Sequence, residues 1–386
     1  ATAPATALAT TDRLRIGYLS SNLNNHPIGQ VTLSLFAAHN RRRVETHGFT
    51  RVAGVSPADA YAARHRAGFD RVHDVTGLDG GRLADCIRAA EIDVLVYLDG
   101  HMDKAGLLAM ARRPAPVRVF WLGHAGGVGS TVADYLLADR LVAPPGDETL
   151  YGEALVRLPP CYHVADRHPT ATVRERRDYG LPENGVVFCA FNNAEKIDEA
   201  AFVCWMDILR RVDGGVLWLS RSGVQPEQRE SLSRFAAACG VAPERIILAA
   251  REPDKRDHLA RHLAADLFLD TWTMNASTTA LDALCAGLPM ITLAGNCFSN
   301  RIAGSMLTAL GMGDLICPTP AAYAAMATAL ALNPQARTEL RRRLRRNLET
   351  TPLFDAPAFA AKLEDAYFRM WETRRGGGAP APFDMD

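Results

Sequence analysis

The sequence has no excess of either charge and no segment long and apolar enough to suggest a membrane span. Lys+Arg and Asp+Glu number 43 each in 386 residues, so the chain has no global field that would attract nucleic acid or an anionic membrane surface. The most apolar helical stretch, Ala321 to Leu332, is roughly a dozen residues and falls short of the ~20 that a span needs. We therefore expect neither a nucleic-acid partner nor a membrane partner.

The sequence also lacks a cysteine framework and a secretion signal. Its eight cysteines form no CxxC pair and no regular spacing, which is typical of a reducing, cytoplasmic protein rather than of a disulfide scaffold or a zinc site. Residues 1–12 have no basic segment and no strong apolar core, so a signal peptide is not expected there. We interpret 1–12 as a disordered linker. It begins with Ala rather than Met, as the cut end of a longer protein would. We expect a disordered tail at 375–386.

The common phosphate and metal motifs are missing too. There is no GxxxxGK[ST], and the glycine-rich loop Gly123–Ser130 does not fit GxGxxG, which disfavours a P-loop and a dinucleotide dehydrogenase. The only DxD is Asp384-Met385-Asp386, in the expected tail. A metal-dependent sugar transferase needs such carboxylates on an ordered loop, so we expect no metal and no other cofactor.

Short apolar β runs alternate with helical patterns along most of the chain. The first half has such runs at 15–21, 44–52, 92–100, 117–123 and 154–159, and the second at 185–192, 214–220, 245–251, 266–272 and 288–294. This alternation predicts α/β domains with parallel sheets. We expect two Rossmann-like domains, 13–165 and 183–374, joined by a linker at 166–182 and facing a cleft, with helices ending the second domain and the C-terminal helix packing back.

The strongest chemical motif runs from Asp270 to Asp282, where a strand enters a helix. Asn275 or Ser277 suits the N-cap position. The amides of Thr278 and Thr279 would then face an anion such as a β-phosphate. Asp282, one turn further, could accept hydrogen bonds from ribose hydroxyls. The alternative is an ordinary polar cap, with Asp282 merely placed near the positive end of a helix.

Two further segments of the second half carry cations. Lys196 follows the first strand there and could neutralise a departing diphosphate, although a lone lysine is more often a solvated loop residue. Lys255, His258 and Arg261 have helical spacing, and His258 and Arg261 share a face on which a uracil ring could stack. The alternative is an exposed basic helix face.

The first half offers a histidine after its first strand. Pro27 suits the first position of a helix, and His26 just before it could orient or deprotonate an acceptor hydroxyl. A histidine used only as a helix cap is the alternative. His124, in the glycine-rich loop, is a weaker candidate, and the glycines of that loop would let the backbone approach a sugar closely.

Together these segments resemble family 41 of the glycosyltransferases, the O-GlcNAc transferases and their bacterial relatives. The similarity covers about residues 13 to 374 and lies in LRIGYLSSNLNNHP, RPAPVRVFWLG, the GlyGly-x-Gly loop, CAFNNAEKID, GGVLWLSR, LDTWTMNASTTALDALCAGLPMIT and RIAGSMLTALG. The resemblance implies a GT-B fold and an inverting, metal-independent enzyme that uses a UDP-sugar. The tetratricopeptide repeats that usually precede this region in the family are absent from this sequence.

The resemblance also implies roles for individual residues. His26 matches the histidine of the catalytic cleft, and Asn193 and Lys196 match the pair at the diphosphate. The ribose and uracil group corresponds to Lys255, His258, Arg261 and Asp282, and the phosphate-binding helix start to Ser277, Thr278 and Thr279. Asn275, the other N-cap candidate, is also expected to take part in binding the nucleotide. The sugar pocket is expected at Leu122, Gly123 and Met274.

Three positions depart from the animal members of the family. Ser277 stands where they have His, Met274 where they have a small Cys near the N-acetyl pocket, and Glu195 where they have an aromatic residue. We expect transfer of GlcNAc from UDP-GlcNAc to Ser or Thr of a protein. The alternatives are UDP-glucose or another nucleotide hexose, an Asn acceptor, or a weakly active module that only binds the nucleotide sugar.

Overall fold

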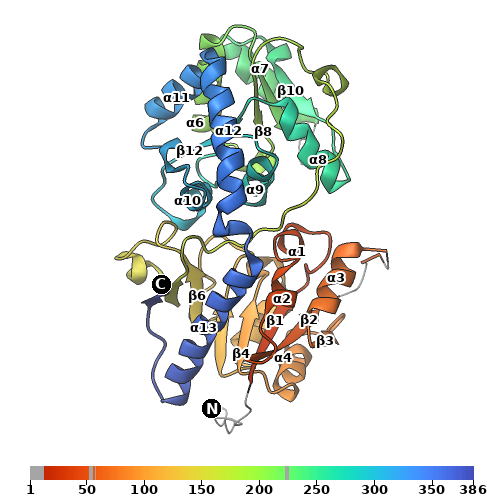
Figure 1. Ribbon diagram of the computed structural model, residues 1–386, viewed down its shortest axis with the longest axis vertical. Helices are drawn as coiled ribbons and strands as arrows, with labels where there is room; N and C mark the ends of the chain where they lie inside the picture. The colour runs from red at the N-terminus through yellow and green to blue at the C-terminus, as the bar shows by residue number, and fades with distance from the viewer. Residues whose placement is uncertain (1–12, 52–54, 57, 222–225) are drawn as a thin grey trace. The chain divides into compact units, whose positions relative to one another are not determined.

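The computed structural model describes residues 13–51, 55–56, 58–221 and 226–386, and the linker expected at 1–12 lies outside them. The chain forms two compact units, Ala1–Asp166 with Pro352–Asp386 and Arg167–Thr351 (Figure 1). No helix in the described part of the chain combines the length and apolarity of a transmembrane segment.

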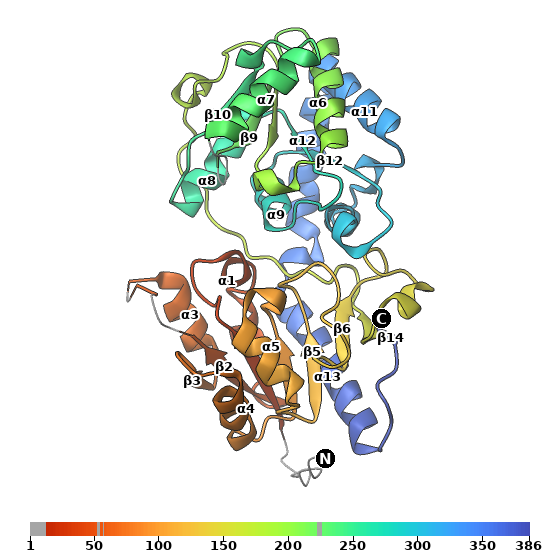
Figure 2. The same ribbon diagram turned by 180° about the vertical axis from the view of Figure 1, so that it is seen from behind.

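The first unit is built on a parallel sheet of eight strands in the order β14-β7-β6-β5-β4-β1-β2-β3. The strands are β1 Leu14–Ser20, β2 Val44–Thr50, β3 Arg71–Asp74, β4 Val94–Tyr97, β5 Val117–Phe120, β6 Tyr135–Ala138, β7 Ala154–Arg157 and β14 Phe383–Asp384. The helices are α1 Pro27–Val31, α2 Leu35–Ala38, α3 Ala60–Gly68, α4 Gly80–Ala89, α5 Lys104–Ala111 and α13 Ala356–Arg375. Figures 1 and 2 show α2 and α13 over one face of the sheet and α4 and α5 over the other.

The central strands of this sheet are covered on both faces, which explains their mostly apolar sequence. Every residue of β4, Val94–Tyr97, and of β5, Val117–Phe120, is buried. The buried aromatic ring of Tyr18 on β1 packs against Phe36 of α2. The core thus fixes the positions of these strands, and with them the polar residues that follow their carboxyl ends.

The second unit has a six-stranded parallel sheet in the order β10-β9-β8-β11-β12-β13. Its strands are β8 Val187–Ala190, β9 Val216–Ser220, β10 Ile246–Ala249, β11 Leu267–Leu269, β12 Met290–Leu293 and β13 Ile316–Cys317. Its helices are α6 Glu199–Arg211, α7 Pro226–Ala238, α8 Lys255–Arg261, α9 Thr278–Cys285, α10 Ile302–Ala309, α11 Pro320–Leu332 and α12 Pro334–Thr350. In the two views α6 and α7 cover one face, and α9 and α12 cover the other. The strand order reverses between β8 and β11, which is where ligands bind in open α/β sheets.

The end of the chain differs from the sequence-based expectation. Residues 352–374, expected in the second domain, belong to the first unit, where α13 packs against α2 and β5. The tail is not disordered, because Phe383 and Asp384 pair with β7. Phe383 is buried beneath the Arg369 guanidinium, 4.1 Å from the ring centre, and Asp384 accepts a hydrogen bond from Arg157.

The expected linker at 166–182 also differs, because most of it packs on the second unit. Arg176 binds the carboxylate of Asp266 at 2.7 Å and the carbonyl of Ala264 at 3.0 Å. The amide of Ala171 donates to the carbonyl of Arg256. The chain therefore enters the second unit at 166–167 and leaves it at 351–352.

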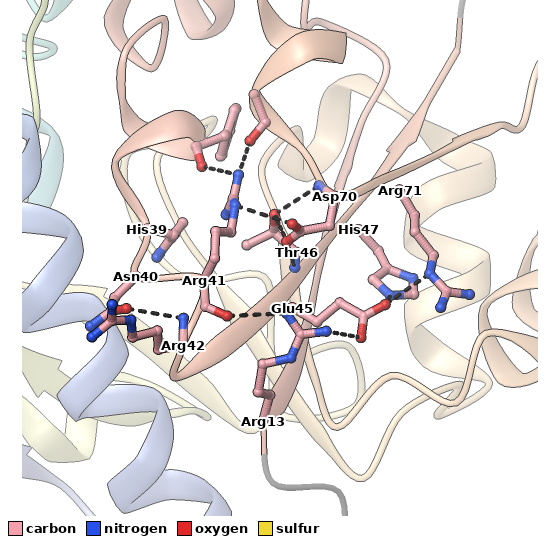
Figure 3. Close-up of polar contacts among 12 residues, drawn as sticks. Arg13, His39, Asn40, Arg41, Arg42, Glu45, Thr46, His47, Asp70 and Arg71 are labelled. Atoms are coloured by element: carbon pink, nitrogen blue, oxygen red, sulfur yellow. Dashed lines mark hydrogen bonds and ion pairs between the residues drawn. The ribbon is translucent and has the colours of Figure 1, made fainter.

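Ion pairs tie together the amino ends of β1, β2 and β3 (Figure 3). Glu45 on β2 accepts from Arg13 at 3.0 Å and from Arg71 at 2.8 Å. Arg41 pairs with Asp70 at 3.2 Å and also binds the carbonyl of Phe36. These groups bind each other and the backbone, so we assign this edge of the sheet to stability rather than to ligand binding.

Candidate functional site

The polar loop after β11 leads directly into α9. Ser277 occupies the N-cap position, although its side chain does not bond to the amides of the first turn. Thr278 and Thr279 are the first residues of α9, where backbone N–H groups have no acceptor within the helix. The start of α9 is therefore suited to an anion, as the sequence predicts.

Asn275 is buried within this loop, two residues before the N-cap of α9. It is fully buried, and its side-chain amide donates to the carbonyl of Thr271 at 2.8 Å. Its own carbonyl accepts a hydrogen bond from the ammonium of Lys196 at 2.9 Å. Of the two candidates for the N-cap, Ser277 holds the position, and Asn275 holds the shape of the loop.

Lys196 comes from the short 3-10 turn Ala194–Lys196 that follows β8. Its bond to Asn275 joins segments 79 residues apart, so it is not a solvated loop lysine. Burial lowers the pKa of its ammonium, and the neighbouring carboxylate of Asp270 opposes that shift. Asn193 begins the turn, its carbonyl accepts the Lys196 amide at 3.0 Å, and the residue is exposed.

Lys255, His258 and Asp282 form one compact cluster. Lys255 Nζ lies 2.6 Å from one carboxylate oxygen of Asp282, and His258 Nε2 lies 3.0 Å from the other. Burial alone would raise the pKa of Asp282, but Lys255 and His258 outweigh it and hold the pKa well below its usual range. The side chains are 10–18% exposed, so they do not form the exposed basic face considered as the alternative.

Arg261 differs from the expectation that it stacks on a base together with His258. The residue is 4% exposed. Its guanidinium lies over the ring of Phe191, 4.1 Å from the ring centre, and donates to the carbonyl of Ala250 at 2.9 Å. Arg261 therefore stabilises the loop after β10 through the Ala250 carbonyl. Of Arg261 and His258, only His258 remains partly accessible to solvent.

Two buried residues that sequence reasoning missed organise the loop before α9. Asp270 accepts from the amides of Thr271 at 2.9 Å and Ala276 at 2.7 Å, and burial raises its pKa to about 6. Asn192 donates to the Thr271 hydroxyl at 2.7 Å and accepts from the Thr279 hydroxyl at 2.5 Å. The available signal was their position, since Asp270 directly follows β11 and Asn192 lies two residues after β8, the two buried strands at the reversal point of the sheet.

The first unit carries His26 at the carboxyl end of β1. The residue caps α1, and its Nδ1 accepts the amide of Ile28 at 3.3 Å. Pro27 follows at the first helical position, as the sequence predicts. Burial lowers the pKa of His26, and the carboxylate of Asp99 opposes the shift.

Leu122 and Gly123 follow β5, and Asp99 follows the neighbouring strand β4. All three residues therefore lie at the carboxyl end of the parallel sheet. Leu122 has a φ of 81°, which is rare for a residue with a side chain. Gly123 has no room for a Cβ, because one would lie 1.8 Å from the carbonyl oxygen of Leu98. His124 follows, and its ring contacts that of His101 edge to face at 4.9 Å.

The rest of this glycine-rich loop is held by one carboxylate. Glu153 accepts the amides of Val128 at 2.6 Å and Gly129 at 2.7 Å, and it lies where a Cβ of Gly127 would be. Met274, the third residue expected in the sugar pocket, belongs to the second unit, where it is half-buried and its carbonyl accepts the Thr271 hydroxyl at 2.6 Å. The structure thus gathers Lys196, Lys255 and Asp282 in the second unit, whereas His26, Leu122 and Gly123 belong to the first.

Comparison with known proteins gives one consistent family. The sequence model of glycosyl transferase family 41 matches residues 2–170 and 167–363. The chain is 37% identical over 383 residues to a probable UDP-N-acetylglucosamine–peptide N-acetylglucosaminyltransferase, SEC, of Arabidopsis thaliana, covering 97% of this chain and 38% of that protein. It is 30% identical to the SPINDLY protein of Oryza sativa, which bears the same enzyme description, covering 97% of this chain and 40% of that protein. The chain thus spans about two fifths of the length of these relatives.

A solved structure agrees. A mutant of Thermobaculum terrenum O-GlcNAc transferase superposes with a TM-score of 0.86 at 35% identity, covering 95% of this chain and 69% of that chain. The N-terminal domain of Candida albicans trehalose-6-phosphate phosphatase, at 13% identity and a TM-score of 0.58, shares the fold alone. The architecture is therefore GT-B.

Proposed function

Because this chain belongs to glycosyltransferase family 41, we propose that it transfers GlcNAc from UDP-GlcNAc to Ser or Thr hydroxyls of a protein, with inversion and without a metal. The observation that carries the proposal is the bond between Lys196 and the loop that opens α9. It brings a partly buried ammonium close to a helix start that can bind phosphate.

The second unit supplies what a departing UDP requires. As the bond to the sugar breaks, negative charge develops on the diphosphate, and a group already fixed in place stabilises it best. Lys196 provides a positive charge for the diphosphate, and the amides of Thr278 and Thr279 provide aligned dipoles. Asp282 keeps its negative charge at neutral pH and has lone pairs for ribose hydroxyls in addition to its two bonds.

The first unit supplies neutral polar groups for an acceptor. His26 presents an imidazole after the carboxyl end of β1, and Leu122 and Gly123 place the backbone of the loop after β5 at the same end of the parallel sheet. Such groups can hold a hydroxyl nucleophile and a sugar by hydrogen bonds. Protein acceptors fit the description of the relatives as peptide N-acetylglucosaminyltransferases.

A cytoplasmic location is part of the proposal. All eight cysteines are free thiols, and Cys161, Cys189 and Cys317 are buried. Buried free thiols suit a reducing compartment. Fractionation of the native host cell, followed by detection of the protein in each fraction, tests this point.

The central experiment incubates the protein with UDP-GlcNAc, UDP-glucose and other UDP- and GDP-hexoses together with a peptide library. Mass spectrometry then identifies the sugar added and the residue modified, and Lys196→Ala serves as the inactive comparison. We expect GlcNAc on Ser or Thr. Transfer of another hexose or modification of Asn would replace the donor or acceptor assignment, and tight UDP binding without turnover would contradict the enzymatic proposal.

A further inference from the structure

The two ring nitrogens of His26 have different surroundings. Pro27 has no N–H, so the first amide of α1 that needs an acceptor is that of Ile28. His26 Nδ1 accepts it at 3.3 Å. The opposite ring orientation would turn a C–H toward this amide, so Nδ1 is the capping atom.

The cap determines where the imidazole carries its proton. An atom that accepts a hydrogen bond needs a free lone pair, so Nδ1 is unprotonated. A neutral imidazole then carries its single proton on Nε2. Burial lowers the pKa of His26, which favours this neutral form near pH 7.

The turn that carries His26 is anchored to the buried carboxylate of Asp99, at the end of β4. Asp99 accepts from the amide of Ser21 at 2.6 Å and its hydroxyl at 2.7 Å, and from the side chain of Asn22 at 3.1 Å. Asn24 continues the chain of bonds, because its side chain donates to the Ser21 carbonyl at 3.3 Å and its own carbonyl accepts the His26 amide at 2.6 Å. Asp99 thus sets the position of His26 without touching it.

We propose that Asp99 is a positioning residue that, through this turn, holds His26 as a fixed Nε2–H donor, so that His26 orients the acceptor and does not remove its proton. The inference rests on the proposed function and deepens it. The only lone pair of the neutral ring faces the Ile28 amide, so proton uptake at Nδ1 would break the cap. Nε2 can only donate, so His26 holds the acceptor by a hydrogen bond and does not take up its proton.

The first test measures the tautomer directly in the ligand-free protein. Two-bond ¹H–¹⁵N correlation spectra of uniformly ¹⁵N-labelled protein at pH 7 distinguish protonated from unprotonated ring nitrogens, and loss of one set of signals in His26→Ala assigns the residue. We expect Nδ1 unprotonated and Nε2 protonated. A proton on Nδ1, or exchange between the two forms, would overturn the inference whether or not the protein transfers GlcNAc.

The second test separates positioning from stability. Asp99→Asn should abolish the fixed tautomer pattern of His26 and lower kcat by about 10²-fold, as a small misplacement of a catalytic group does, with little change in KM for the UDP-sugar. Asp93→Asn is the matched control, because Asp93 is also buried and lies at the other end of β4, where it accepts the Arg15 amide at 2.8 Å. It should leave the His26 spectrum and kcat unchanged.

A milder variant keeps the test decisive if Asp99→Asn does not fold. Ser21→Ala removes one donor to Asp99 and should move the His26 signals in the same direction by a smaller amount. An Asp99→Asn protein that folds, keeps the wild-type tautomer and turns over normally would exclude the positioning role. If both Asp99→Asn and Asp93→Asn alter His26 equally, Asp99 acts only through the general stability of β4, which would also overturn the proposal.

Discussion

The two groups of functional residues, one in each unit, are organised by different forces. In the second unit, Lys196, Lys255 and Asp282 are charged, largely buried and within bonding distance of a partner. In the first unit, the turn that carries His26 is held by hydrogen bonds of serine and asparagine to the single carboxylate of Asp99.

The difference follows from what each group would bind. A nucleotide diphosphate is strongly charged, and fixed, partly dehydrated charges stabilise it more than mobile ones in water. A hydroxyl acceptor is neutral and gains more from orientation than from charge. Removing a charged group of the second unit should therefore lower the stability of the protein and weaken binding of the sugar donor. Disturbing the turn of the first unit should instead misplace His26.

The largest effect is expected at Asp282. Asp282→Asn removes the carboxylate that Lys255 and His258 bind in a nearly buried cluster, and removing one member of a buried ion pair costs about 3–5 kcal/mol. We expect a loss of that size in the free energy of unfolding, measured in urea, and weaker UDP binding by calorimetry. Asp314→Asn is the control in the same unit, because its pair with Arg343 is exposed and should be worth under about 1 kcal/mol.

The stability lost in Asp282→Asn should depend on pH. The pKa of Asp282 is lowered in the folded protein, so its contribution to stability is complete above the unfolded-state pKa of about 3.9 and is lost as the pH falls toward the folded value. The stability difference between the wild type and Asp282→Asn should be constant near neutral pH and shrink below about pH 4. An unchanged difference across that range would contradict the assigned charge state.

The next largest effect is expected at Lys196. Lys196→Ala should reduce kcat by on the order of 10²-fold or more, because it removes a positive charge fixed beside the diphosphate, whereas UDP affinity should fall less. Steady-state kinetics with UDP-GlcNAc and calorimetric titration with UDP separate the two. Lys104→Ala, at an exposed lysine of the first unit, should have normal kinetics, and near-normal turnover of Lys196→Ala would exclude the role.

A smaller effect is expected at Met274. We propose that this flexible, bulky side chain lowers the preference for UDP-GlcNAc over UDP-glucose by crowding the acetamido group. A crowded methyl-sized group costs about 1–3 kcal/mol, or ~10–200-fold in kcat/KM. Met274→Cys or Met274→Ala should raise the ratio for UDP-GlcNAc in competition assays. An unchanged ratio would move the donor choice to the loop Gly123–Ser130.

The smallest effect is expected from removing metal. If Lys196 and the helix amides handle the charge of UDP, activity should survive EDTA with at most a minor change. Initial rates before and after chelation test this directly. A loss that manganese or magnesium restores would show that the charges of the second unit are not sufficient.

The sequence was most informative where structure depends on local pattern. The runs at 92–100 and 117–123, for example, contain β4 and β5. The start of α9 was likewise predicted from its polar cap and following helix. These features follow from periodicity and from the conformational preferences of a few neighbouring residues.

Features that depend on distant contacts were missed. β3 has mostly exposed residues and no apolar run, and β14 forms only because its two residues meet β7, more than 200 positions earlier. The assignment of α13 to the first unit and the packing of buried Arg261 over the ring of Phe191 are likewise long-range. Asn192 was passed over because its partners Asp270, Thr271 and Thr279 lie 78 to 87 residues away.

The short strand β14 has a practical consequence for anyone who prepares this protein. The sheet of the first unit ends in β3, which carries Arg71 and Asp74, and in β14, which has only two residues; short or charged edges resist pairing with another molecule. Truncation after Arg375 would make the longer β7 the terminal strand, with open backbone groups beside the buried side chains of Leu155 and Val156. Light scattering should then detect self-association. Removing this tail to ease crystallisation would therefore expose an edge strand that can pair with another molecule.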